Sequence, residues 1–162
     1  IIRERDDIIE DRFDRLIHEC KILDFSESID LDEFFKKVSS VFSKRVNLDE
    51  KTIYELLWER ERESSTVITS SLAIPHIVIP GKGKFDVVLA RFKEGIVFDE
   101  GTPPINKVFV LLGTQEERNF HLKALAAIAQ IAQDDEFEKN WLEARDIGEL
   151  RDAVLLGERK RE

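Results

Sequence analysis

Residues 70–80 read Ser-Ser-Leu-Ala-Ile-Pro-His-Ile-Val-Ile-Pro, an apolar run that carries one titratable side chain, His76. Apolar and β-branched residues dominate residues 72–79, and this pattern predicts a buried β-strand. Pro75 fixes its own φ angle and restricts Ile74 to extended geometry, so the backbone that reaches His76 has little freedom. We therefore expect a His76 of fixed orientation, either hydrogen-bonded at a strand edge or acting as a nucleophile.

Further short strands are expected on both sides of this run. Stretches of apolar and β-branched residues are bounded by turn-forming glycines, prolines and acidic residues, which is typical of strands. The additional strands predicted in this way are residues 22–25, 67–68, 87–92, 96–98 and 108–112.

Elsewhere apolar residues recur at intervals of three or four, the period of an amphipathic helix. Thr114-Gln115-Glu116-Glu117 has the spacing of a capping box, and the helix after it is apolar on nearly all sides, so we expect that helix to be buried on more than one side. The expected helices are residues 6–20, a segment from Asp30 or Asp32 to about 42, 49–62, 120–133, 137–144 and 146–156.

These elements predict a single α/β domain, in which a mixed sheet of about five strands is flanked by helices. Residues 1–20 would be an amino-terminal helical lead-in or linker, residues 21–157 the domain, and residues 158–162 a charged tail. The sequence begins with Ile1 rather than Met, so we expect it to be a fragment of a longer protein.

Composition excludes several classes of partner. The formal net charge of −9 argues against nucleic acid or an anionic membrane surface, because both favour clustered Lys and Arg. The single cysteine, Cys20, permits no internal disulfide, and no Cys/His spacing suggests a metal site, so a reducing cytoplasmic compartment is expected. No apolar run approaches the roughly 18 residues that insert into a bilayer. We expect no cofactor and no metal.

Two further histidines differ in their surroundings. His121 follows the capping-box motif and shares a helix face with Leu125 and Ile128, so its imidazole should point into the protein. Burial disfavours the charged form, and we expect a neutral hydrogen-bonding group there. His18 lies on the first expected helix with no strained turn near it, which favours a structural or surface role.

An ordered set of motifs resembles the type-2 EIIA domains of the bacterial phosphotransferase system, the fructose, mannitol and nitrogen-regulatory kind. The motifs are Arg60-Glu61, Ser65-Thr66, the Ala-Ile-Pro-His sequence ending at His76, the strand 108–112, and His121-Leu122 opening an Ala/Leu/Ile helix. The resemblance covers roughly residues 22–156. It implies a three-layer EIIA fold and no cofactor.

The resemblance also implies roles for particular residues. His76 would accept a phosphoryl group from the phosphocarrier HPr and pass it to a cysteine of an EIIB domain. Arg60 and His121 match the family residues that stabilise the phosphoryl group, and Thr66 would lie near the phosphate. An imidazole is partly neutral at pH 7 and leaves readily, and a guanidinium suits phosphate oxygens, so these residue types fit the chemistry.

The sequence departs from the family where Thr69 and Ser71 replace two glycines. A Cβ there would hinder positive φ angles and close approach of the backbone to phosphate. Two outcomes are compatible with this departure. Either Ser70 and Ser71 compensate by donating hydroxyl hydrogen bonds, or the domain keeps the fold without the phosphoryl transfer.

Two functions therefore remain open. The first is a histidine phosphocarrier that works with an HPr-like protein and an EIIB domain. The second is a non-catalytic EIIA-like regulatory domain on the cytoplasmic tail of a membrane transporter, tethered through the first helix. A histidine-based metal site or a hydrolase has little support, because the three histidines offer no ligand spacing and no serine elbow is present.

Overall fold

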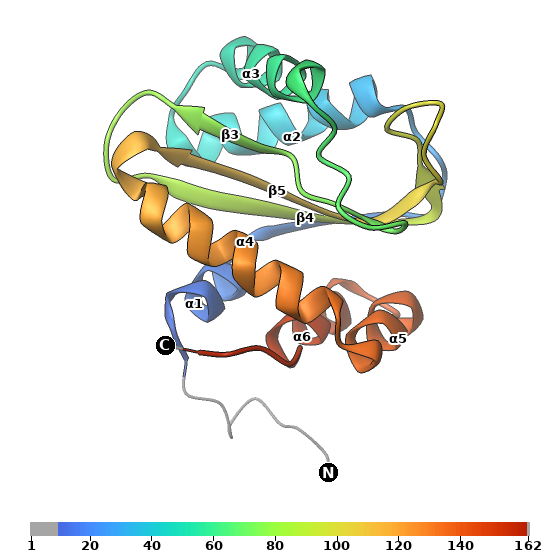
Figure 1. Cartoon of the computed structure of the whole chain (residues 1–162). Helices are drawn as coiled ribbons and strands as arrows, with labels where there is room; N and C mark the ends of the chain where they lie inside the picture. Colours follow the sequence, from blue (N-terminus) through green and yellow to red (C-terminus); the bar gives the residue numbers. More distant parts are fainter. Residues whose placement is uncertain (1–9, 162) are drawn as a thin grey trace.

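The long central strands carry side chains that alternate between two buried faces of the sheet. In β5 (Ile105–Thr114), Phe109 and Leu111 belong to one core cluster, whereas Val110 and Leu112 belong to another. Burial on both faces is typical of a strand that is covered by helices on each side. The computed structural model, which describes residues 10–161, accordingly has three layers, with the sheet between two layers of helices (Figure 1).

Within residues 10–161, five strands form one mixed sheet. Their order is β1, β4, β5 and β2, and β3 pairs with the same side of β5 as β2 does. β4 and β5 are antiparallel, and the other pairs are parallel. This confirms the predicted α/β domain with about five strands. The remaining strands are β1 (Lys21–Phe25), β2 (Leu72–Ala73), β3 (His76–Ile79) and β4 (Phe85–Ile96).

Six α-helices occupy the described residues, and none of them combines the length and apolar character needed to cross a membrane. Three begin where the sequence predicts, because the carboxylates of Asp30, Asp49 and Asp146 accept hydrogen bonds from backbone N–H groups of the first turn. One face of the sheet is covered by α2 (Leu31–Val46) and α3 (Glu50–Glu63), and the other by α1 (Arg12–Glu19), α4 (Arg118–Ala132), α5 (Asp135–Glu143) and α6 (Ile147–Leu155).

The single strand predicted for residues 72–79 is wrong, because two short strands replace it. The chain leaves the ladder at Ile74 and Pro75, where Pro75 has no N–H to donate. The Pro75 carbonyl still accepts a hydrogen bond of 2.9 Å from the Leu111 N–H, so β5 remains in register with both pieces. This break lies directly before His76.

Two other strand predictions are wrong in their boundaries. Residues 96–98 do not form a separate strand, because β4 continues through Gly95 to Ile96. Gly95 has a φ of 83°, a conformation that other residues rarely adopt. Residues 67–68 contribute only one isolated bridge, between Val67 and Ala73.

Two expectations for α4 are also wrong. A short 3₁₀ turn, Gln115–Glu117, precedes the helix, and Thr114 does not cap it, because its hydroxyl donates to Glu116 Oε1 at 2.6 Å. The helix is not buried on more than one side, since Leu122 is 55% exposed. Its fully buried residues lie along one face: Ala124, Ala127, Ile128 and Ile131.

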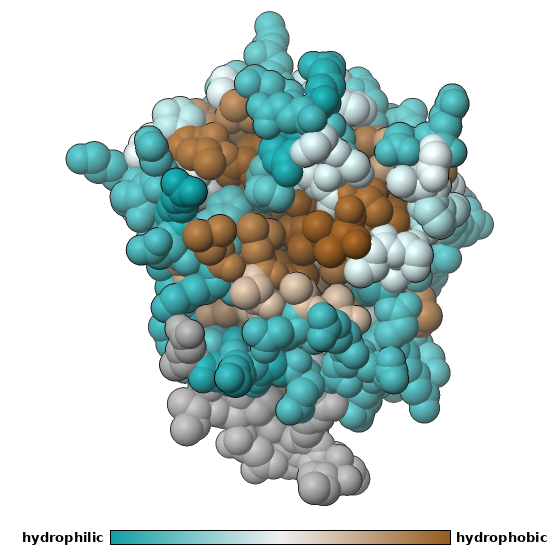
Figure 2. Space-filling view, viewed as in Figure 1, coloured by the Kyte–Doolittle hydropathy of each residue, from teal (hydrophilic) through white to brown (hydrophobic). Residues whose placement is uncertain are grey.

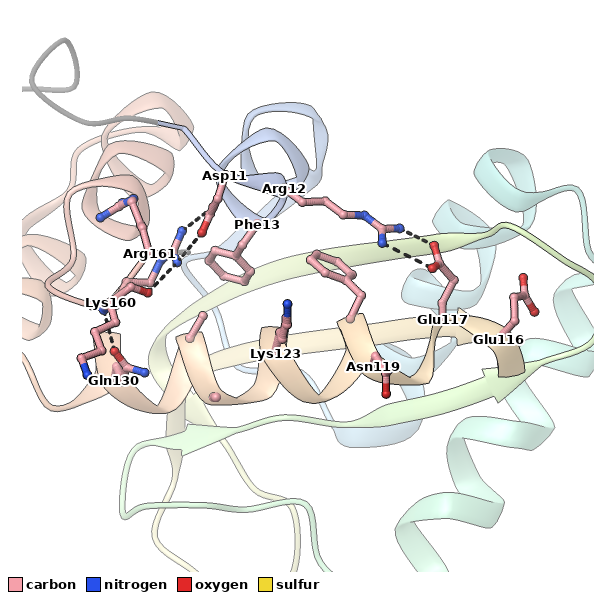
Figure 3. A pocket seen from close by; sticks show the side chains of 14 residues that line it. Asp11, Arg12, Phe13, Glu116, Glu117, Asn119, Lys123, Gln130, Lys160 and Arg161 are labelled. Atoms are coloured by element: carbon pink, nitrogen blue, oxygen red, sulfur yellow. Dashed lines mark hydrogen bonds and ion pairs between the residues drawn. The ribbon is translucent and has the colours of Figure 1, made fainter.

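Helix α1 packs against the core and against the residues that follow α6 (Figure 3). Arg159 pairs with Asp11 at 2.8 Å and with Asp14 at 3.0 Å, and Arg161 pairs with Asp14 at 2.8 Å. Phe13 is buried in the same core cluster as α4 and α6. Part of the helix expected at residues 6–20 lies outside the described residues, and the division into lead-in, domain and tail stays a prediction.

Candidate functional site

His76 is the first residue of β3, and its two ring nitrogens have different neighbours. Nδ1 lies 2.7 Å from the carbonyl oxygen of Ile74, which can only accept, so Nδ1 carries the proton and donates. Nε2 lies 3.4 Å from Nη2 of Arg60, and a guanidinium can only donate, so Nε2 accepts. These contacts select one neutral tautomer, with the lone pair on Nε2 beside Arg60.

Arg60 reaches His76 from the last turn of α3. Its Nη1 donates to the carbonyl oxygen of Ser64 at 3.0 Å and to Ser64 Oγ at 3.2 Å. A cation is favoured at the carboxyl end of a helix, where carbonyl groups lack partners. Sequence reasoning missed Ser64 as the residue that holds the guanidinium, although its position at the end of the helix, four residues after Arg60, is a usable signal.

Thr66 lies beside the site but its hydroxyl is already engaged. Thr66 is 1% exposed, and its Oγ1 and N–H donate to the Glu61 carboxylate at 2.6 and 3.1 Å. Its carbonyl oxygen accepts from the Ile74 N–H at 2.9 Å. Glu61 and Thr66 therefore fix the segment whose Ile74 carbonyl orients His76, and direct contact of Thr66 with a phosphate stays a prediction.

His121, on the first turn of α4, packs against His76. The ring centroids lie 5.4 Å apart at an interplanar angle of 77°, and the Phe85 ring lies 5.5 Å from His121 on another side. Burial lowers the pKa of the His121 imidazole to about 4, and the charge of a protonated His76 adds to the shift. Within the described residues, the buried Nε2 of His121 has no hydrogen-bond partner. The expected neutral histidine with spare hydrogen-bonding capacity thus lies next to His76.

A pocket of about 340 Å³ opens between β3 and the start of α4. His76, His121 and Arg118 line it together with Thr114, Gln115 and apolar side chains. Of the apolar ones, Val78 is 57% and Leu122 55% exposed. Apolar surface gathers near the centre of the face shown in Figure 2. A larger pocket of about 590 Å³ lies beside α1 and the chain end (Figure 3), but neither His76 nor His121 lines it. The candidate functional histidines therefore line the smaller pocket.

Ser71 is not brought to His76. Its Oγ accepts a hydrogen bond from Lys107 Nζ at 2.8 Å, at the end of β5 that pairs with β2. Thr69 Oγ1 accepts from the Ser71 N–H at 3.2 Å, and Ser70 is exposed in the same loop. Asn47 is the one non-glycine residue of the described chain with a positive φ, so neither Thr69 nor Ser71 is strained.

His18 pairs with Glu10 Oε1 at 2.6 Å on α1, which fits the surface role expected from the sequence. Over residues 10–161, no group of three or more His, Cys, Asp and Glu side chains could hold a metal ion.

Known proteins are similar to this chain over most of its length. Residues 16–155 match the family described as phosphoenolpyruvate-dependent sugar phosphotransferase system, EIIA 2. The chain is 33% identical over 109 residues to a nitrogen regulatory protein of Bradyrhizobium diazoefficiens, covering 67% of this chain and 71% of that protein. It is 28% identical over 131 residues to the fructose-specific EIIABC component of Bacillus subtilis, covering 80% of this chain and 20% of that protein.

Solved structures show the same fold at lower identity. The nitrogen regulatory protein IIA-Ntr from Neisseria meningitidis is similar with a TM-score of 0.74 and 21% identity, over 86% of this chain and 94% of that one. IIA mannitol from Escherichia coli is similar with a TM-score of 0.67 and 16% identity, over 83% and 95%. Because the family match spans most of the chain and the fold agrees, this chain belongs to the type-2 EIIA family of the phosphotransferase system.

Proposed function

We propose that this domain is a histidine phosphocarrier that accepts a phosphoryl group from phosphorylated HPr on Nε2 of His76 and passes it to a cysteine of an EIIB domain. The observation that carries the proposal is the tautomer of His76. The Ile74 carbonyl holds the proton on Nδ1, and the lone pair of Nε2 lies beside the Arg60 guanidinium. Membership of the EIIA family supplies the class of reaction.

In the accepting step, the Nε2 lone pair attacks the phosphorus atom of the donor's phosphohistidine. The Nε2–P bond forms as the donor's P–N bond breaks, and the donor imidazole leaves with the electron pair of that bond. The His76 proton stays on Nδ1 in its hydrogen bond to the Ile74 carbonyl. Because no proton has to move during attack, the domain mainly has to position the ring and compensate charge.

Charge compensation falls to Arg60 and His121. The Arg60 guanidinium lies 3.4 Å from the attacking nitrogen and can donate to the phosphoryl oxygens as they arrive. The neutral His121 can donate one hydrogen bond without adding charge, and its unpartnered nitrogen is buried next to His76. In the donating step a cysteine thiolate attacks phosphorus, and Nε2 takes back the electron pair of the Nε2–P bond.

Incubation with HPr, the kinase of HPr and phosphoenolpyruvate tests the carrier function. We expect one acid-labile, alkali-stable phosphate per chain in the wild type and none in His76→Gln, with unchanged thermal stability of the variant. His18→Gln, which removes an imidazole from α1, serves as the control and should be labelled like the wild type. Lack of label in the wild type, or label retained in His76→Gln, would contradict the proposal.

A second candidate function is a regulatory EIIA-like domain that transfers no phosphoryl group and is attached to the cytoplasmic side of a membrane transporter. The arrangement of α1 favours it, because ion pairs of Asp11, Arg12 and Asp14 fix this helix to the domain, and none of these three residues lines the His76 pocket. A tether entering through α1 would leave the pocket open. An unlabelled wild type that still binds a transporter fragment through the Val78 and Leu122 surface would support this second function.

A further inference from the structure

The His76 pocket has a charge composition unlike that of the whole chain. The chain carries 34 acidic and 25 basic residues, yet none of the Asp and Glu residues that the structure describes lines this pocket. Among the described residues that line it, Arg118 alone carries a permanent charge, and its neighbours are two imidazoles, the uncharged polar Thr114 and Gln115, and apolar side chains. A concave surface with a guanidinium and no carboxylate attracts anions even in an acidic protein.

The carboxylates next to Arg118 in the chain are engaged elsewhere. Glu116 accepts hydrogen bonds from the Thr114 hydroxyl and from the Gly83 N–H. Glu117 pairs with Arg12 of α1 (Figure 3). Within residues 10–161, no ion pair or hydrogen bond of the Arg118 guanidinium is present, and the residue is exposed. Arg118 is therefore available to a group outside the chain.

The position of Arg118 also breaks a local rule. It is the first residue of α4, and a cation at the amino end of a helix is disfavoured by the partial positive charge of the unpaired N–H groups. Local rules are broken most often at functional sites, where the cost is compensated by function. One helical turn further on, His121 carries its unpartnered Nε2 on the same helix face. Both groups could meet one anionic oxygen.

We propose that Arg118 is a second phosphoryl-binding arginine of this domain, which contacts the oxygens of the phosphoryl group in transit to and from His76. The inference rests on the proposed carrier function. Arg60 approaches His76 from the end of α3 and does not line the pocket, whereas Arg118 lies at the start of α4. Two guanidiniums on different elements would thus hold the phosphoryl group, with Arg118 on the side that faces an incoming partner.

Two phosphoryl donors test this role. Phosphorylated HPr requires docking, whereas phosphoramidate is a small donor whose P–N bond breaks as the Nε2–P bond forms, with ammonia as the leaving group. We expect Arg118→Gln to slow labelling of His76 about tenfold with both donors, because a charge-assisted hydrogen bond is lost. Arg118→Lys keeps the positive charge and should slow labelling less than Arg118→Gln does. Arg15→Gln removes an exposed arginine of α1 outside the pocket and should leave both rates unchanged.

The outcomes separate this inference from the carrier function. Slowing with HPr alone would make Arg118 a docking contact and overturn the inference, and so would equal rates for wild type and Arg118→Gln with both donors. Labelling of the wild type by phosphoramidate but not by HPr would defeat the carrier function alone. If neither donor labels the wild type, the protein is titrated with inorganic phosphate and followed by NMR, which tests whether the anion site exists. Saturable shifts of the His76 and His121 resonances that weaken about tenfold in Arg118→Gln support the anion site, and absence of shifts in the wild type overturns it.

Discussion

Strand β5 pairs with β2 near one end and with β3 near the other. The two ends differ in whether the charged side chains there have hydrogen-bond partners within the chain. At the β2 end, the Lys107 side chain is 2% exposed, contacts Glu138, and donates to Ser71 Oγ at 2.8 Å and Asn106 Oδ1 at 3.1 Å. At the β3 end, Arg118 is exposed and its guanidinium has no partner within the described residues, and His121 Nε2 has none either.

This difference distinguishes polar groups that stabilise the fold, whose hydrogen bonds are satisfied within the chain, from polar groups that are available to a ligand. A buried ammonium is tolerated only when its donors are satisfied, and Lys107 meets this condition within the chain. The groups around His76 leave donors unused at an open pocket with exposed apolar walls. Spare hydrogen-bonding capacity beside a nucleophile is expected where a ligand arrives and departs.

Removing the buried ammonium should give the largest change in stability. We expect Lys107→Ala to lower the free energy of unfolding by about 3 kcal/mol, because Glu138 and Ser71 lose their shared partner. Urea denaturation measures this change. Lys51→Ala removes an exposed lysine paired with Glu55 and should cost less than about 0.5 kcal/mol. Folded Lys107→Ala should be labelled at a rate within about twofold of wild type, and a large loss of labelling would mean that the two ends are coupled.

Protonation of His121, at the β3 end of the sheet, should make the stability of the domain depend on pH. The folded-state pKa of about 4 lies below the ordinary value of 6.5, so the folded chain binds this proton more weakly than the unfolded chain. The contribution of His121 to stability is thus complete above about pH 6.5 and disappears as the pH falls towards 4. Urea denaturation at pH 7 and pH 4.5 should show a smaller acid-induced loss in His121→Gln than in wild type, by about 1 kcal/mol.

His18→Gln is the matched control for this pH experiment, since it removes an imidazole that lies outside the pocket. The acid-induced loss of stability in the control should be close to that of the wild type. An equal loss in His121→Gln and wild type would show that the buried imidazole does not set the acid response of this end.

The smallest effect is expected at Ser71, one of the two positions where the resemblance leads us to expect glycine. Ser71→Gly should cost about 1 kcal/mol, because Lys107 loses a hydroxyl acceptor and the unfolded chain gains freedom. The rate of His76 labelling should stay within about twofold of wild type. Leu72, next to Ser71, pairs with Lys107, whereas His76 pairs with Leu111, four residues further along β5, a separation on the order of 13 Å. Ser70→Gly, in the exposed part of the loop, is the control. Labelling that becomes tenfold faster in Ser71→Gly would show that the serine obstructs the phosphoryl group.

Much of the fold follows from the sequence because local signals and tertiary packing agree. The helices that begin after Asp30, Asp49 and Asp146 combine a side-chain cap with an apolar face. The errors have particular causes. Periodicity cannot show that Ile74 and Pro75 leave the ladder between two collinear strands, and the apolar outer face of α4 resembles a buried face when its neighbours are unknown.

The candidate site was predictable in part. The resemblance singled out His76, His121 and Arg60, and the structure brings these three together. The hydrogen bonds that orient them, such as those that Arg60 donates to Ser64 and His76 donates to the Ile74 carbonyl, depend on backbone geometry that a sequence does not display. The role expected for Ser71 beside a phosphate stays a prediction. In the structure its hydroxyl accepts from Lys107, a contact that a sequence does not display, because a loop residue directly before a strand can face either end of the sheet.

The pairing of Asp11 and Asp14 with Arg159 and Arg161 has a mechanical consequence. The first and last described segments lie side by side near α1, on the side of α4 that is turned away from β3 (Figure 1). A pulling force applied through these two segments would separate the paired carboxylates and guanidiniums first, and the sheet would carry little load. Motion of attached segments would therefore be absorbed at this junction, and the geometry around His76 would be preserved.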